Sequence, residues 1–134
     1  MPLLPRDIQR ISSILKARRK ELKLTQTDLA CFAGVSVRLI SSFESNNPNI
    51  QLNKLLMLTT ALGYRGEPFN YPNGISQAVI DRRKDLKLTQ SDAASFSGVS
   101  RSFVMDLESG KETTRAAEVF KVLHGLGLAR DFTI

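Results

Sequence analysis

Six polar or charged side chains with DNA-binding chemistry occur in the same order in two parts of the chain. In each part a glutamine is followed by a serine and then an arginine: Gln26, Ser36 and Arg38, then Gln90, Ser100 and Arg101. A serine at a helix N-terminus caps backbone N–H groups or hydrogen-bonds a phosphate. An arginine fork matches guanine O6 and N7 in the major groove. The pattern therefore indicates nucleic acid more than catalysis.

The sequence contains few residues in patterns suited to catalysis or to metal binding. His124 is the single histidine and Cys31 the single cysteine, and no carboxylate cluster at ligand spacing accompanies them. We therefore expect no enzymatic activity, no cofactor and no metal. Cys31 lies in an apolar helical stretch and is interpreted as a small core side chain. One cysteine and no long apolar segment predict a cytoplasmic protein without a membrane span.

The net charge of +6 is unevenly distributed. Residues 1–70 carry ten Lys or Arg against five Asp or Glu, whereas residues 71–134 carry nine against eight. Basic charge is only weak evidence for nucleic acid. Its concentration in the first half favours that half as the stronger contact with an anionic partner.

An internal repeat with a constant offset of 64 residues organises the chain. Residues 18–45 and 82–109 are identical at 16 of 28 positions, including Gly-Val-Ser at 34–36 and 98–100. We predict two small domains, 1–64 and 74–134, with a connector at 65–73 that is rich in Pro, Gly and Asn. Domains of this size are marginally stable alone, so packing of one against the other would help.

Caps, breakers and apolar periodicity predict an all-α fold of four helices in each unit. The expected helices span about 7–22, 25–33, 36–45 and 51–62, and then 75–86, 90–97, 101–109 and 115–126. The inner stripe of the fourth helix is 52, 55, 56, 59 and 62 in the first unit, and 116, 119, 120, 123 and 126 in the second. On the first helix the expected inner face includes Leu22.

Two features suggest how the units join. Residues 69–71 and 130–134 alternate apolar and polar side chains after equivalent helices. We expect them to pair across a pseudo-twofold axis as a small two-stranded antiparallel sheet. A spare apolar face on the fourth helix, Met57 and Leu58 with Val122 opposite, could form the rest of the joint.

Each unit resembles the phage-repressor/Cro-like (Xre) helix-turn-helix family. The resemblance covers nearly the whole chain twice. It is carried by LTQTDLA at 24–30 and LTQSDAA at 88–94, and by the turn and following helix at 35–41 with Glu44. The family implies two lambda-repressor-like domains that bind double-stranded DNA. Residues 40–46 also resemble HipB-type antitoxins, which add a C-terminal strand that pairs across a dimer.

The resemblance implies a role for each matching residue. Base-reading positions are Val37, Arg38, Ser41, Ser42, Arg101, Ser102 and Met105. Phosphate contacts are Thr25, Gln26, Ser36, Asn47, Thr89, Gln90, Ser100 and Lys111. In the family the glutamine also buttresses the recognition helix. The family glutamate pairs with an arginine of the first helix, which here gives the structural ion pairs Arg19–Glu44 and Arg83–Glu108.

The two reading faces share no residue. Between 37–43 and 101–107 no position is identical, although the inward positions stay apolar. Either the units read two unlike half-sites, or the second has stopped reading DNA. Asp106 would repel the duplex, and this favours the second unit as the weaker binder.

Two functions remain open. The first is a repressor that acts as a single-chain pseudo-dimer on an imperfect inverted repeat, either as a monomer or as a homodimer. The second is an antitoxin that binds a HipA-like toxin kinase and represses its own operon. Only the family likeness supports the second function.

Overall fold

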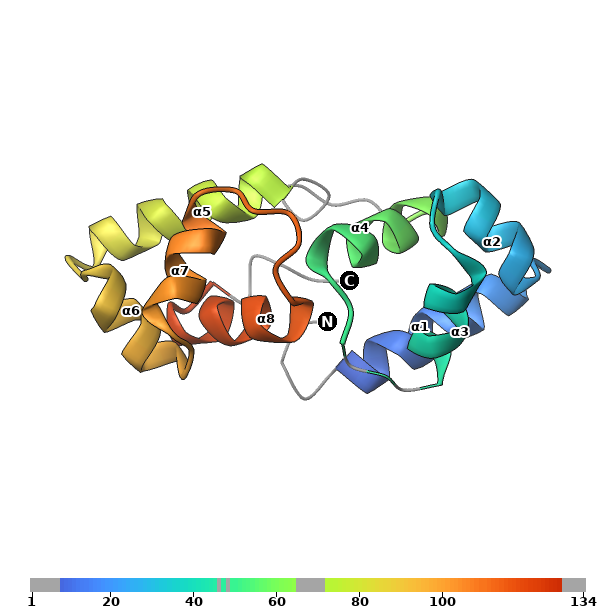
Figure 1. Ribbon diagram of the computed structural model, residues 1–134, viewed down its shortest axis with the longest axis horizontal. Helices are drawn as coiled ribbons and strands as arrows, with labels where there is room; N and C mark the ends of the chain where they lie inside the picture. The colour runs from blue at the N-terminus through green and yellow to red at the C-terminus, as the bar shows by residue number, and fades with distance from the viewer. Residues whose placement is uncertain (1–7, 46, 48, 65–71, 129–134) are drawn as a thin grey trace.

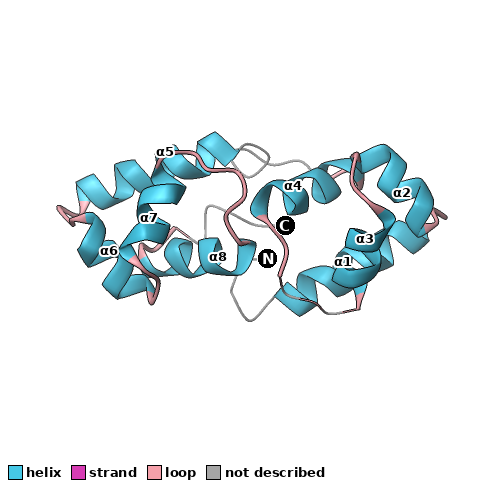
Figure 2. Ribbon diagram, in the orientation of Figure 1, coloured by secondary structure: helices cyan, strands magenta, loops and turns pink. Residues whose placement is uncertain are grey.

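The computed structural model describes residues 8–45, 47, 49–64 and 72–128, which form two groups of four α-helices (Figures 1 and 2). The first unit contains α1 (Ile8–Glu21), α2 (Gln26–Ala33), α3 (Val37–Glu44) and α4 (Leu52–Ala61). The second contains α5 (Pro72–Asp85), α6 (Gln90–Ser97), α7 (Arg101–Glu108) and α8 (Ala116–Gly125). The predicted all-α tandem is confirmed. One boundary differs by more than one residue: α5 begins at Pro72 instead of Ile75, and proline is tolerated in a first helical turn.

The apolar core continues through both units. Both predicted stripes of the fourth helices are buried, from Leu52 to Leu62 and from Ala116 to Leu126. Two predictions about burial are wrong. Leu22 is 41% exposed because α1 ends at Glu21, and Cys31 is exposed because α2 turns Leu29, Ala30 and Ala33 inward instead.

Local sequence sets the ends of the helix-turn-helix segments in the same way twice. Thr25 and Thr89 each form a capping box with the aspartate three residues later, which satisfies two backbone N–H groups. Gly34 follows α2 with φ of +74°, a left-handed conformation that costs glycine little. The end of α2 at Gly34 and the start of α3 after Ser36 together fix the angle between these two helices.

The two units join through backbone groups at the start of α4 and α8. Gln51 and Arg115 form an antiparallel bridge. The Leu52 N–H donates to the Thr114 carbonyl at 2.7 Å, and the Ala116 N–H donates to the Ile50 carbonyl at 2.9 Å. Gln51 and Arg115 are repeat equivalents at an offset of 64, and the same offset relates one hydrogen bond to the other, so the pairing is that of a local pseudo-twofold axis.

This joint also caps both helices. The N-cap residues Gln51 and Arg115 make no side-chain capping bond. The first N–H groups of α4 and α8 lack partners within their own helices and receive them from the opposite unit. A third bond, from the Asn53 N–H to the Glu112 carbonyl at 3.2 Å, adds to the capping of α4. Each unit therefore completes the fourth helix of the other.

The joint lies at a different place from the predicted strands. Residues 69–71 and 130–134 fall outside the described residues, so their pairing stays a prediction. The predicted contact between the fourth helices has a counterpart, since α4 and α8 touch and lie in the middle of the molecule (Figure 1). Leu58 and Val122 are buried, whereas Met57 lines a hollow beside Phe32.

The bridge between Gln51 and Arg115 predicts that a disulfide engineered at these two positions will form. Gln51 and Arg115 form a pair without direct mutual hydrogen bonds, in which Cα atoms are roughly 4.5 Å apart, a separation that a disulfide can span. Q51C/R115C in a C31S background should oxidise within one chain. By loop closure alone, the disulfide should raise the free energy of unfolding by about 4 kcal/mol. Thiol labelling and urea unfolding with and without reductant measure this. Two thiols that stay free under oxidant would contradict the joint.

Candidate DNA interface

The recognition helices α3 and α7 are held by their inward residues. In α3 these are Ile40 and Phe43, which are 1% and 3% exposed. The buried Ser12 hydroxyl of α1 donates to the Phe43 carbonyl at 2.6 Å, and Ser76 makes the equivalent bond to Leu107 at 2.6 Å. The C-terminal end of each recognition helix is thus tied to the first helix of its unit.

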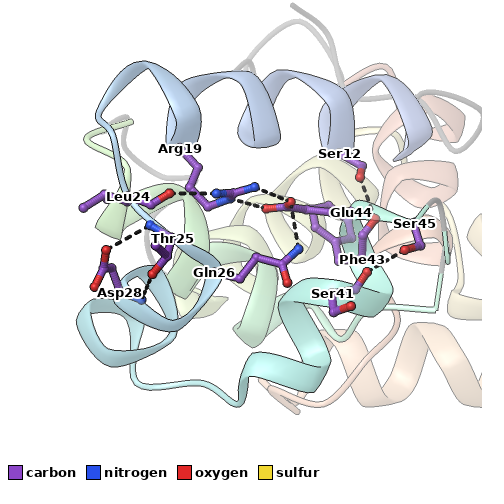
Figure 3. Close-up of polar contacts among 10 residues, drawn as sticks. All are labelled: Ser12, Arg19, Leu24, Thr25, Gln26, Asp28, Ser41, Phe43, Glu44 and Ser45. Carbon is purple, nitrogen blue, oxygen red and sulfur yellow. Dashed lines mark hydrogen bonds and ion pairs between the residues drawn. The ribbon is translucent and has the colours of Figure 1, made fainter.

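A buried ion pair fixes the same end of α3 from a second direction. Arg19 of α1 donates from Nε and Nη2 to the two carboxylate oxygens of Glu44, at 2.7 and 2.8 Å (Figure 3). Gln26 of α2 donates to the same carboxylate at 3.1 Å, and Arg19 also donates to the Leu24 carbonyl at 2.7 Å. Side chains from α1 and α2 therefore converge on the last residue of α3.

The charges of this network stabilise each other. Burial raises the pKa of Glu44, but hydrogen bonds from Arg19 and Gln26 and the nearby positive charges outweigh it, so the pKa lies below its ordinary value. The hydrogen bond with Glu44 raises the pKa of Arg19. The side chains of Arg19 and Glu44 are 9% and 5% exposed. Removing either one would leave the other charge buried and unpaired, which would strongly destabilise the fold.

The second unit repeats the network. Arg83 donates to both carboxylate oxygens of Glu108 at 2.7 and 2.9 Å, and Gln90 adds a third bond at 3.2 Å. Both ion pairs that the resemblance implies are therefore present. The glutamine side chains are turned toward the glutamates. The structure thus shows their buttressing contact, and their phosphate contact stays a prediction.

The predicted base-reading side chains lie on the outer surface of α3 and α7. Those classed as exposed are Val37, Arg38, Ser41, Arg101, Ser102 and Met105. Ser42 is half-buried. Arg38 and Ser42 line one surface hollow together with Ser36 and Asn47. The outer face of α3 and the residues that flank the helix thus offer a guanidinium, hydroxyls and an amide to a ligand.

The predicted phosphate-binding residues are engaged within their own units. Thr25, Thr89, Ser36 and Ser100 all use their hydroxyls as N-caps. The capping boxes with Asp28 and Asp92 were missed, although the Thr-x-x-Asp spacing signals them. A hydrogen bond from the Thr25 backbone lowers the pKa of Asp28.

Other site types find no support in the described part of the chain. Those residues hold no group of three or more histidines, cysteines or carboxylates that could bind a metal. Among the described helices none is long and apolar enough to cross a membrane.

Comparison with known proteins agrees with the geometry. The helix-turn-helix family model matches twice, at residues 15–69 and 79–132. The chain is 38% identical over 60 residues to the uncharacterised HTH-type transcriptional regulator y4mF of Sinorhizobium fredii, covering 45% of this chain and 79% of that protein. No solved structure matches significantly. The chain therefore belongs to the Xre-like helix-turn-helix family of DNA-binding transcriptional regulators, with two copies of the domain.

The buried ion pair predicts a pH-dependent loss of stability in E44Q. Removing one partner leaves the Arg19 charge buried, so the variant should lose about 3 kcal/mol of unfolding free energy at pH 7. Because folding lowers the pKa of Glu44, its contribution is complete above the pKa of the unfolded chain and disappears as the pH falls through the folded pKa. Urea unfolding from pH 7 to 3 should show the two proteins converging.

The exposed Glu21 provides the control for this experiment, since its ion pair with Arg18 leaves the glutamate side chain 70% exposed. E21Q should remain close to the wild type throughout the pH range. A constant gap between the wild type and E44Q down to pH 3 would contradict the assigned role of Glu44.

Proposed function

We propose that this regulator represses transcription as a single-chain pseudo-dimer, with α3 and α7 reading the halves of an imperfect inverted repeat. The observation that carries the proposal is the joint, in which Gln51 lies opposite its own repeat equivalent Arg115. Helix-turn-helix proteins commonly bind DNA as twofold dimers. Here the pseudo-twofold relation lies within one chain.

The twofold relation supports simultaneous reading by both helices. The pairing of equivalent residues at the joint supports a twofold arrangement, in which α3 and α7 occupy equivalent places on either side of the axis. Figure 1 places them in opposite halves of the molecule, separated by α4 and α8. Two half-sites on one face of B-DNA are about 34 Å apart. Occupation of both within a promoter would exclude RNA polymerase.

In this proposal, exposed side chains of α3 and α7 make the contacts with bases and phosphates. Arg38 reads guanine in the first half-site, and Val37 contacts a thymine methyl. Arg101 is the corresponding reader in the second, one position earlier along its helix than Arg38 is along α3. Ser36 and Ser100, at the N-termini of the recognition helices, approach phosphates with their helix N–H groups. The +5 charge of residues 1–70 makes the first unit the stronger contact.

Removing each reader separately tests whether both units bind. R38A and R101A should each weaken binding to the regulator's own upstream DNA by about 10- to 100-fold, since a bidentate contact to guanine is worth about 1–3 kcal/mol. K121A removes an equal charge from an exposed site on α8 and should lose much less. Electrophoretic shift titrations measure this. Weakening in R38A with none in R101A would contradict reading by the second unit.

A further inference from the structure

One position of the recognition helix is linked to the following turn in both units. The Asn47 N–H donates to the Ser42 carbonyl at 3.2 Å, and the Lys111 N–H donates to the Asp106 carbonyl at 3.1 Å. These residues are equivalent at the offset of 64, so the same backbone hydrogen bond occurs in both units. It brings the side chain of the turn residue over that of the helix residue.

The chemistry at this shared position differs. In the first unit the Asn47 amide donates to the Ser42 hydroxyl at 2.9 Å, which is a neutral pair. In the second unit the Lys111 ammonium lies 3.5 Å from the Asp106 carboxylate, with the two side chains 54% and 49% exposed. Lys111 offsets the negative charge that Asp106 would otherwise present to a duplex. The charge of Asp106 is therefore not by itself an obstacle to DNA.

The two side chains also differ in what they recognise. A serine hydroxyl both donates and accepts, so Ser42 tolerates bases of either kind. An ionised carboxylate only accepts, so Asp106 favours an exocyclic amino group and disfavours guanine O6 and N7 and thymine O4. Cytosine presents its N4 amino group in the major groove, whereas adenine adds an N7 acceptor beside its amino group. Of the two amino-bearing bases, cytosine fits a carboxylate better.

The contact with Lys111 leaves the Asp106 carboxylate able to accept a hydrogen bond from the N4 amino group of cytosine. The ion pair involves Oδ2, and among the described residues no hydrogen bond to Oδ1 is present. Both side chains are about half exposed, and exposed pairs contribute little to stability. The pair is thus poorly placed to hold the fold, and both side chains remain accessible to a ligand.

We propose that Asp106, charge-balanced by Lys111, makes α7 select cytosine at one position of its half-site, so that the chain sits on its operator in one orientation. This inference rests on the proposed function, since it requires both units to read DNA. It assigns the second unit a base preference that the first unit lacks. The operator is then an inverted repeat whose two halves differ at this position.

The repeat provides its own matched variants. D106S/K111N places the first unit's pair in the second unit, and S42D/N47K does the reverse. The full-length wild type and both variants are used to select binders from a duplex library with a randomised 30-base-pair core. The wild type should enrich an asymmetric site with cytosine required in one half. D106S/K111N should lose that requirement by about tenfold or more in affinity ratio against thymine, and S42D/N47K should gain one in the other half.

The outcomes separate the inference from the function on which it rests. If the wild type enriches no sequence, the proposed function fails and the inference fails with it. If the wild type enriches a site and D106S/K111N enriches the same site with the same cytosine, the function stands and the inference is overturned. Unchanged thermal unfolding of the variants, expected because all four side chains lie at the surface and are at least partly exposed, shows that a changed preference comes from the reading face.

Discussion

The backbone pairing of residues 50–52 with residues 114–116 is the constraint on which the arrangement of the two units depends. It supplies partners to the first N–H groups of α4 and α8, which their own N-cap side chains leave unsatisfied. Uncapped helix ends buried at an interface are costly, so neither unit is complete without the other. Because the bonds join backbone groups, they persist although the paired segments share no residue. The repeats could therefore diverge on their surfaces while the joint between them was kept.

A second constraint separates the frame of each unit from its reading face. The glutamate at the end of each recognition helix is bound by an arginine of the first helix and a glutamine of the second, with matching distances in the two units. Every residue of this network is identical between the repeats, whereas none of the seven positions 37–43 matches its equivalent. The exposed residues of α3 and α7, which we propose read bases, can change without disturbing this network because they lie outside it. This is the arrangement that an asymmetric operator would require.

Much of the fold could be predicted from the sequence, because caps and apolar stripes are local signals. Thr25, Gly34 and the stripe from Leu52 to Leu62 mark helix ends and inner faces without reference to the rest of the chain. The inward turn of α2 was harder. Residues 29–33 are all apolar, so periodicity could not show that Cys31 and Phe32 would lie outside.

The joint was not predicted, because its bonds are between backbone groups and leave no trace in residue type. Its indirect sign is the absence of a capping residue at Gln51 and Arg115. The ion pair of Glu44 was expected from family resemblance, since spacing alone does not select one arginine of α1 over its neighbour. The antitoxin interpretation rests on likeness at residues 40–46 and stays a prediction.

The proposed pseudo-dimer requires one chain to supply both recognition helices to one operator. Native mass spectrometry of the full-length protein with its operator duplex tests it most directly, because it counts chains per duplex. The pseudo-dimer predicts one chain on one duplex at saturation, with a shortened duplex that holds a single half-site bound more weakly. A complex of two chains on the full operator, with equal affinity for the half-site duplex, would contradict it.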